Sequence, residues 1–236
     1  MKINHIPGES RGKGDHEWLK SRFSFSFADY YDPSRMGFGP LRVINDDWIA
    51  PGSGFPPHSH RDMEIFTIPL SGKLHHKDNT GKESVIGPGE IQIMSAGTGV
   101  THSEFNDSET EPLNLLQIWI EPSIRGISPR HEEKSFPFLN EKNKLHEIIN
   151  PTGESNALKI QQGAYIYLGT WNKKEEIKFH MHGANNGLYI FVIEGMISVG
   201  EVAANKKDAL EVTQAENISI RVSENTFLLI IEVPNV

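Results

Sequence analysis

Short apolar segments alternate with glycine, proline and polar residues along this chain. Residues 91–94, 115–120 and 218–222 are such segments, and each is too short for a typical globular helix. Isoleucine, leucine and valine dominate them, as strand packing favours. Many short strands separated by turn residues predict an all-β protein built from sandwiches or barrels.

One apolar pattern occurs twice, which suggests an internal repeat. Residues 65–72 (IFTIPLSG) resemble residues 188–195 (LYIFVIEG), and both segments end at a glycine shortly after a His-x-His motif. Two copies of one β-barrel module would explain the chain length. Residues 135–156 between the copies are polar and charged, so we expect a connection there, with a short helix around residues 144–149.

Composition narrows the class of protein. The chain has 236 residues, a formal net charge of −8 and no cysteine. Disulfides, thiolate metal sites and a cysteine nucleophile are therefore excluded, and the acidic charge argues against a nucleic-acid partner. The amino-terminal residues lack an apolar signal segment, and the densest apolar run, residues 227–231, is too short to span a membrane. We expect a cytoplasmic protein with no membrane partner.

Two histidine-containing motifs carry the candidate chemistry. One is His58-Ser59-His60 and the other is His102-Ser103-Glu104. Alternate residues of a strand point to the same face, so each motif offers two ligand side chains to one point. A lone strand histidine is more often structural, but three imidazoles with one carboxylate suit a first-row transition metal, most naturally non-haem iron.

The spacing around these motifs resembles the two signatures of the cupin superfamily. The first reads Gly52-x5-His58-x-His60-x3-Glu64 with Gly72 beyond, and the second reads Gly99-x2-His102-x3-Asn106. Two departures are a glutamate-to-glycine spacing one residue longer than usual and Gly97 where proline is usual. Longer segments resemble one cupin subgroup, the pirin family, densely over residues 16–131: FSFADYYDP (25–33), LRVINDD (41–47), IQIMSAGTGVTHSEFN (91–106) and LNLLQIWIEP (113–122).

The pirin resemblance implies a bicupin of two antiparallel, jelly-roll-like barrels. Residues 1–134 would form the metal-binding barrel, and residues 135–236 a second barrel without a complete metal site. The family's ligands fall on His58, His60, His102 and Glu104. The resemblance implies one divalent transition metal, with Fe(II) expected first and Mn, Ni, Cu, Co or Zn as alternatives.

Other candidate residues receive less weight. Glu64 is the usual cupin carboxylate, but on a regular strand it lies about 13 Å from His60 at ~3.3 Å per residue, so we expect it to orient a ligand or form a salt bridge. His180 and His182 are one residue out of register with the first barrel and would face outward. We interpret His75 and His76 as hairpin residues, and the aromatic residues 23–31 chiefly as core.

The function implied by the resemblance is that of bacterial pirins that are quercetin 2,3-dioxygenases. Such an enzyme cleaves a flavonol ring with O2 and releases CO, and Glu104 would act as ligand and as general base toward the 3-hydroxyl. The alternative from another class is a non-enzymatic, metal-binding, redox-sensing regulator of pirin type with a protein partner. A third hypothesis is a sugar-binding or isomerase cupin. Such a protein would not require a complete ligand set, whereas this chain has one. We expect a monomer.

Overall fold

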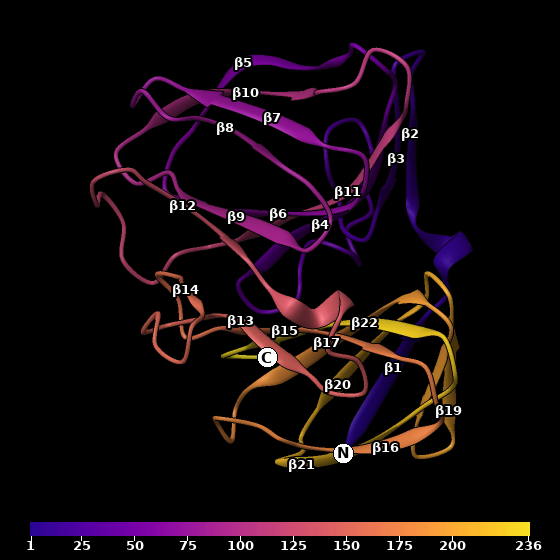
Figure 1. The fold of residues 1–236 in the computed structure, drawn as a ribbon. Coiled ribbons are helices and arrows are strands. Elements are labelled where there is room, and N and C mark those ends of the chain that lie inside the picture. Colours follow the sequence, from indigo (N-terminus) through magenta and orange to yellow (C-terminus); the bar gives the residue numbers. More distant parts are fainter.

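The protein, described here by a computed structural model that covers residues 1–236, folds almost entirely into strands. Two halves lie one above the other, and each half pairs a seven-stranded sheet with a four-stranded sheet (Figure 1). Two short 3₁₀ helices, η1 (Gly8–Ser10) and η2 (Pro137–Leu139), are the only helical turns. The predicted all-β bicupin fold is confirmed.

The first half holds the candidate ligands in its smaller sheet. That sheet has the order β5 (Gly54–His60), β10 (Val100–Asn106), β7 (Leu74–Asp78) and β8 (Glu83–Ile86). The larger sheet has the order β12 (Arg130–Ser135), β9 (Glu90–Ser95), β6 (Glu64–Ser71), β11 (Leu113–Ile120), β4 (Leu41–Ile49), β3 (Leu19–Phe23) and β2 (Gly12–Asp15). The strand pairs within both sheets are antiparallel.

The second half repeats this arrangement. Its larger sheet has the order β1 (Lys2–Ile6), β20 (Ala209–Thr213), β17 (Gly187–Glu194), β22 (Thr226–Val233), β15 (Tyr165–Trp171), β13 (His146–Asn150) and β14 (Leu158–Lys159). Its smaller sheet has the order β16 (Glu175–His180), β21 (Asn217–Val222), β18 (Met196–Val199) and β19 (Val202–Asn205). The repeated segments 65–72 and 188–195 fall on β6 and β17, which occupy the same place in the two larger sheets.

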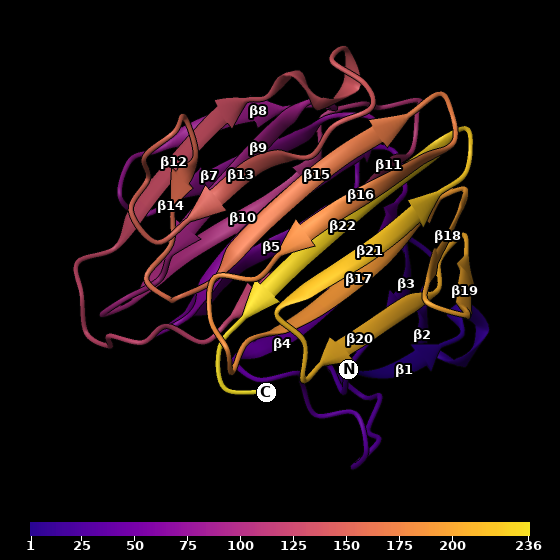
Figure 2. The ribbon, with the colours of Figure 1, turned by 90° about the horizontal axis from the view of Figure 1, so that it is seen from below.

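The amino-terminal strand joins the sheet of the second half. β1 pairs with β20 along its whole length, and Figure 2 shows the two strands side by side. At the corresponding edge of the first half, β12, the strand just before the connecting segment, pairs with β9. Residues 2–6 thus lie with the second half, although a division of the chain at residue 134 would assign them to the first. The boundary itself stays a prediction.

The larger sheets of the two halves pack against each other through a shared apolar core. This core contains 28 buried residues drawn from both halves, among them Phe66, Ile118 and Tyr189. A charged contact also joins the halves: the buried Asp46 carboxylate lies 2.9 Å from Lys207 Nζ and 3.6 Å from Arg11 Nη2. The guanidinium of Arg11 in turn lies 5.0 Å from the ring centroid of Phe191. The halves are therefore held together by apolar burial and by a buried charge cluster.

The predicted helix over residues 144–149 is wrong. This segment enters β13, which pairs with β15, and the only helical turn in the connection is η2. Ile148 and Ile149 are fully buried in the shared core, so burial at the sheet edge outweighs the local helix preference. No helix of the protein is long and apolar enough to cross a membrane.

Candidate metal centre

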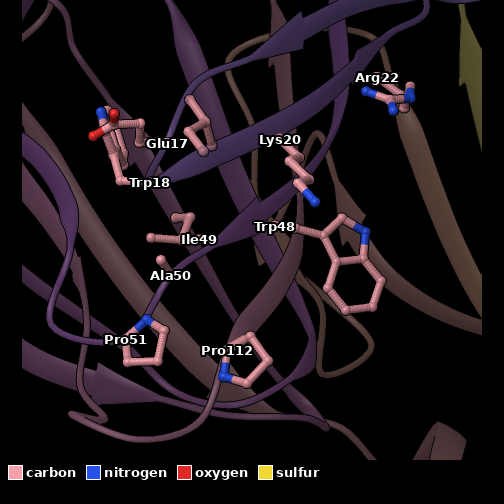
Figure 3. A pocket seen from close by; sticks show the side chains of 10 residues that line it. Glu17, Trp18, Lys20, Arg22, Trp48, Ile49, Ala50, Pro51 and Pro112 are labelled. Atoms are coloured by element: carbon pink, nitrogen blue, oxygen red, sulfur yellow. The ribbon is translucent and has the colours of Figure 1, made fainter.

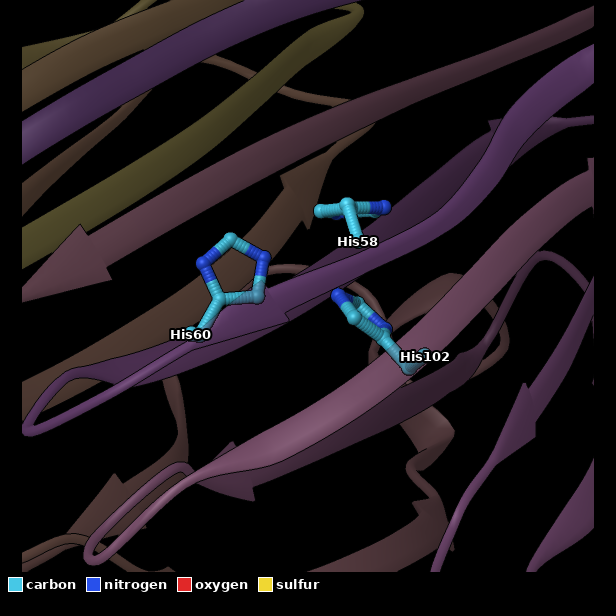
Figure 4. Close-up of side chains that lie close together, drawn as sticks. All are labelled: His58, His60 and His102. Atoms are coloured by element: carbon cyan, nitrogen blue, oxygen red, sulfur yellow. The ribbon is translucent and has the colours of Figure 1, made fainter.

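Three imidazoles converge on the inner face of the smaller sheet in the first half. His58 and His60 lie on β5, and His102 on β10 is the direct cross-strand partner of His58. The ring centroids are 4.5 to 5.0 Å apart, and one nitrogen from each ring can be chosen so that all three lie within 4.8 Å of one another. Figure 4 shows the cluster between the two strands. The alternation of the two motifs therefore brings these three side chains to one point, as the sequence predicts.

The protonation state of these rings favours metal binding. Nδ1 of His58 lies 2.8 Å from the carbonyl oxygen of Pro56, a bond that leaves Nε2 with its lone pair free. Nε2 of His102 is buried and has no hydrogen-bond partner. Burial lowers the pKa of both His60 and His102 to about 4; the neighbouring imidazoles assist this shift, and the charge of Glu104 opposes it. Both rings are therefore neutral at pH 7, the form that binds a metal.

Glu104 lies beside His102 and is held by two amides. A β-bulge separates the two residues, so Glu104 pairs with Phe55 instead of Pro56. Its Oε1 accepts a hydrogen bond from Gln92 Nε2 and its Oε2 from Gln117 Nε2, both at 2.7 Å. Burial raises the pKa of this carboxyl, but the contacts with His76 and the other imidazoles outweigh burial and hold the pKa below its usual value. The side chain is a buried, oriented carboxylate.

A second cluster of titratable side chains lies next to Glu104 and was not predicted from the sequence: His76, Asp78 and His131. His76 on β7 is fully buried, with Nδ1 3.5 Å from His102 Nδ1 and 4.0 Å from Glu104 Oε1. Its Nε2 lies 3.2 Å from Asp78 Oδ2, and the ring of His131 is 4.5 Å away. His75, the neighbouring residue of β7, points to the opposite face. Leu74, His76 and Asp78 are the buried residues of β7, and the sequence alone carries no signal of which face of this strand turns inward.

Glu64 makes its hydrogen bonds away from the imidazoles. Its Oε2 accepts hydrogen bonds from Ser95 Oγ at 2.9 Å and from the backbone N–H of Gln161 at 3.2 Å. Burial raises its pKa, although these hydrogen bonds and the charge of Arg130 oppose the shift. Gln161 belongs to the second half, so Glu64 links the halves; a role in orienting a ligand stays a prediction that these contacts do not support.

A cavity of about 260 Å³ opens onto the candidate ligands. His58, His60 and Glu104 line one side, and the inner face of the larger sheet lines the other. Its wall includes four aromatic side chains, and the full lining is His16, Leu19, Ser21, Phe23, Phe27, Ala28, Asn45, Asp47, Phe55, His58, His60, Glu104, Gln117 and Trp119. The aromatic segment 23–31 contributes to the core and to the cavity wall: Phe25 packs in the shared core, while Phe23 and Phe27 line the cavity.

A larger hollow of about 580 Å³ lies elsewhere in the first half. It is lined by Glu17, Trp18, Leu19, Lys20, Arg22, Trp48, Ile49, Ala50, Pro51 and Pro112 (Figure 3). Trp48 and Lys20 are cross-strand partners on β4 and β3. None of the candidate ligands reaches this hollow, so its size alone does not make it the reaction site.

The second barrel has an apolar interior where the first has its histidines. Phe179 on β16 faces Ile218 on β21, and both belong to a core of 17 buried residues inside this half. Met181 is buried in the same core, whereas His180 and His182 are exposed. His180 contacts Asn217 and His182 contacts Glu232. The outward orientation predicted for the two histidines is therefore observed.

The fold and the site together define the class of protein: a bicupin whose first barrel encloses a three-histidine, carboxylate-flanked centre suited to a divalent transition metal. The chain belongs to the pirin family. Residues 7–120 match the family model for Pirin, and residues 147–233 match the model for the Quercetinase C-terminal cupin domain.

Similar proteins and solved structures support the assignment to the pirin family. The chain is 41% identical over 226 residues to Quercetin 2,3-dioxygenase of Escherichia coli K12, covering 96% of both chains. It is 37% identical to Pirin-like protein of Caulobacter vibrioides, covering 98% of this chain and 99% of that one. Among solved structures, the bacterial pirin YhhW from Escherichia coli in complex with nickel(II) superposes with a TM-score of 0.94 at 39% identity, with both chains fully covered.

Proposed function

We propose that this protein is a metal-dependent dioxygenase that cleaves the ring of a quercetin-like flavonol with O2 and releases CO. The observation that carries the proposal is the cavity: His58, His60 and Glu104 line it, so a molecule inside it would meet the candidate metal centre directly. The volume of about 260 Å³ is slightly below the usual range for small-molecule sites, about 300 Å³ and above. The similarity to quercetin 2,3-dioxygenase of Escherichia coli over 96% of the chain supports the same activity.

The metal ligands in this proposal are His58, His60, His102 and Glu104. Three imidazoles, one of them with an unpartnered buried nitrogen, suit a divalent first-row ion, and Fe(II) is the ion we expect in vivo. The nickel(II) complex of the related YhhW supports a divalent metal in general. When bound, the metal supplies a Lewis acid that favours ionisation of the substrate hydroxyl and an open position for reaction with O2.

The protein side chains position the substrate and move its proton. Glu104 accepts the proton of the flavonol 3-hydroxyl, while Gln92 and Gln117 fix the orientation of its carboxylate. Phe27 and Trp119, whose rings meet edge to face with centroids 5.3 Å apart, form an apolar wall that holds a planar ring and excludes water. A carboxylate that already accepts two hydrogen bonds keeps further lone pairs for a metal and for a proton.

The accessible cavity separates this proposal from a redox-sensing regulator. A catalyst needs an open space at the metal, and the first half has one lined by the ligands themselves. A cytoplasmic location, a monomeric state and the choice of iron stay predictions.

Quercetin consumption tests the proposal. Metal-loaded protein should remove the absorbance of quercetin in air and leave it unchanged under nitrogen, and His102→Ala should be inactive in both gases. The same concentration of metal salt without protein controls for uncatalysed oxidation. Equal consumption by His102→Ala, or by the salt alone, would contradict the assignment.

A further inference from the structure

Two buried polar side chains on β4 line the cavity, and each has one oxygen without a hydrogen-bond partner. They are Asn45 and Asp47, and the Oδ1 atom of each is both buried and unpartnered. A buried polar atom left without a partner destabilises the folded protein, so native proteins rarely keep two of them on one wall. Their presence together indicates a ligand that completes them.

These side chains lie on the wall opposite the histidines. Alternate residues of β4 share a face, so Asn45 and Asp47 point the same way, toward the cavity. Asn45 is the cross-strand partner of Gln117 on β11, the residue that donates to Glu104. Asn45 and Asp47 therefore lie on β4, the strand next to Gln117, and Gln117 in turn contacts the proposed base Glu104. At this position they would contact a part of the ligand away from the reacting hydroxyl.

The chemistry of the wall selects hydroxyl groups. A primary amide offers both a donor and an acceptor. Burial raises the pKa of Asp47 to about 7, assisted by Asp46 and Glu104 and opposed by a hydrogen bond from Ser21, so near neutrality part of this side chain is a neutral carboxyl that donates as well as accepts. Phenolic hydroxyls both donate and accept, and a flavonol carries them on the rings away from its 3-hydroxyl.

We propose that Asn45 and Asp47 form a hydroxyl-recognition subsite, which selects a flavonol with ring hydroxyls over a bare 3-hydroxyflavone. The inference rests on the proposed function, because it concerns the cavity of that same reaction. A site built to hydrogen-bond a hydroxyl discriminates strongly against an analogue that lacks it, since the polar groups of the protein are then left unpaired.

Binding under nitrogen tests the subsite without turnover. The dissociation constants of quercetin and of 3-hydroxyflavone are measured on metal-loaded protein by fluorescence quenching. The wild-type protein should prefer quercetin by about tenfold to hundredfold, the effect of one or two buried hydrogen bonds. Asp47→Leu and Asn45→Leu should each reduce this ratio at least about threefold, mainly by weakening quercetin binding.

A matched control separates the subsite from general damage. Trp48→Leu alters the next residue of β4, whose side chain is exposed and does not line the cavity, and it should leave the quercetin to 3-hydroxyflavone ratio unchanged. Equal affinities for the two compounds in the wild-type protein would overturn the proposal even if no variant folds, and so would an unchanged ratio in folded Asp47→Leu and Asn45→Leu. Absence of turnover in air with the ratio preserved would reject the dioxygenase activity and leave the subsite standing.

Discussion

Asp46 and Asp47 are adjacent on β4 but serve opposite faces of the sheet. The Asp46 carboxylate lies in the interface between the halves, 2.9 Å from Lys207 Nζ, while Asp47 faces the cavity with an unpartnered oxygen. Two cations and the amide of Asn114 hold the pKa of Asp46 below its usual value against the effect of burial, whereas burial raises the pKa of Asp47 to about 7. Because successive side chains of a strand point to opposite faces, Asp46 stabilises the interface between the halves, whereas Asp47 lines the cavity.

Replacing Asp46 with alanine should strongly destabilise the protein. The change leaves the buried guanidinium of Arg11 without its carboxylate partner, and loss of one member of a buried ion pair typically costs about 3–5 kcal/mol. Urea unfolding gives the free energy. Asp15→Ala, which removes an exposed ion pair with Arg22, serves as the control and should have far less effect. Similar losses in the two variants would argue against a structural role for the buried cluster.

Asp47 should make stability depend on pH. Its carboxyl keeps a proton in the folded state up to pH about 7 but loses it in the unfolded chain near its ordinary value of 3.8. The folded state therefore binds more protons between these values, and its stability falls as pH rises from about 4 to 7, by roughly 4 kcal/mol at about 1.4 kcal/mol per pKa unit. Below this window the stabilisation is fully present, and above it the loss is complete.

Asp47→Asn isolates this effect. Metal-free wild-type and variant proteins are compared by urea unfolding at pH 5 and pH 8, so that the other titrating groups contribute equally to both. The variant should gain stability relative to the wild type on going from pH 5 to pH 8. A stability difference that is the same at both pH values would show that Asp47 ionises normally in the folded protein.

Removing His102 should remove the metal. His102→Ala deletes the ring whose buried Nε2 has no partner other than the proposed ion, and it leaves two histidines on one strand. The affinity for Ni(II) and Fe(II) should fall at least tenfold, since losses of about 10- to 100-fold are usual even for groups that only support a ligand. Elemental mass spectrometry of the metal bound per chain, after dialysis against known free-ion concentrations, measures this affinity. His180→Ala, an exposed histidine of the second barrel, should retain the wild-type content. Full metal content in His102→Ala would place the ion elsewhere.

Glu104→Gln should separate binding from catalysis. The amide preserves the size of the side chain but cannot accept the 3-hydroxyl proton, and general-base catalysis typically contributes about 10²–10⁴-fold to rate. We expect kcat for quercetin to fall by that order while part of the metal remains bound to the three histidines. Steady-state kinetics on samples of measured metal content give the result. A variant with full activity per bound metal would rule out Glu104 as the base.

The strands and the three histidines could be predicted because both depend on local alternation. His58, His60 and His102 need only strand geometry and one cross-strand pairing to meet. The contribution of His76 could not be predicted in the same way, because its burial depends on which face of β7 turns inward. The contact of Glu64 with Gln161 joins residues 97 positions apart, and the pairing of β1 with β20 spans almost the whole chain. Such long-range contacts leave no periodic signal in the sequence.

The most direct test of the account is the yield of carbon monoxide from quercetin under ¹⁸O₂. Metal-loaded wild-type protein should release about one CO per quercetin consumed, by the stoichiometry of the proposed ring cleavage, and should place ¹⁸O from O2 in the remaining product. His102→Ala at the same protein concentration should release none. Quercetin consumption without CO, or CO release that does not depend on His102, would contradict the assignment of a flavonol-cleaving dioxygenase centred on the three histidines.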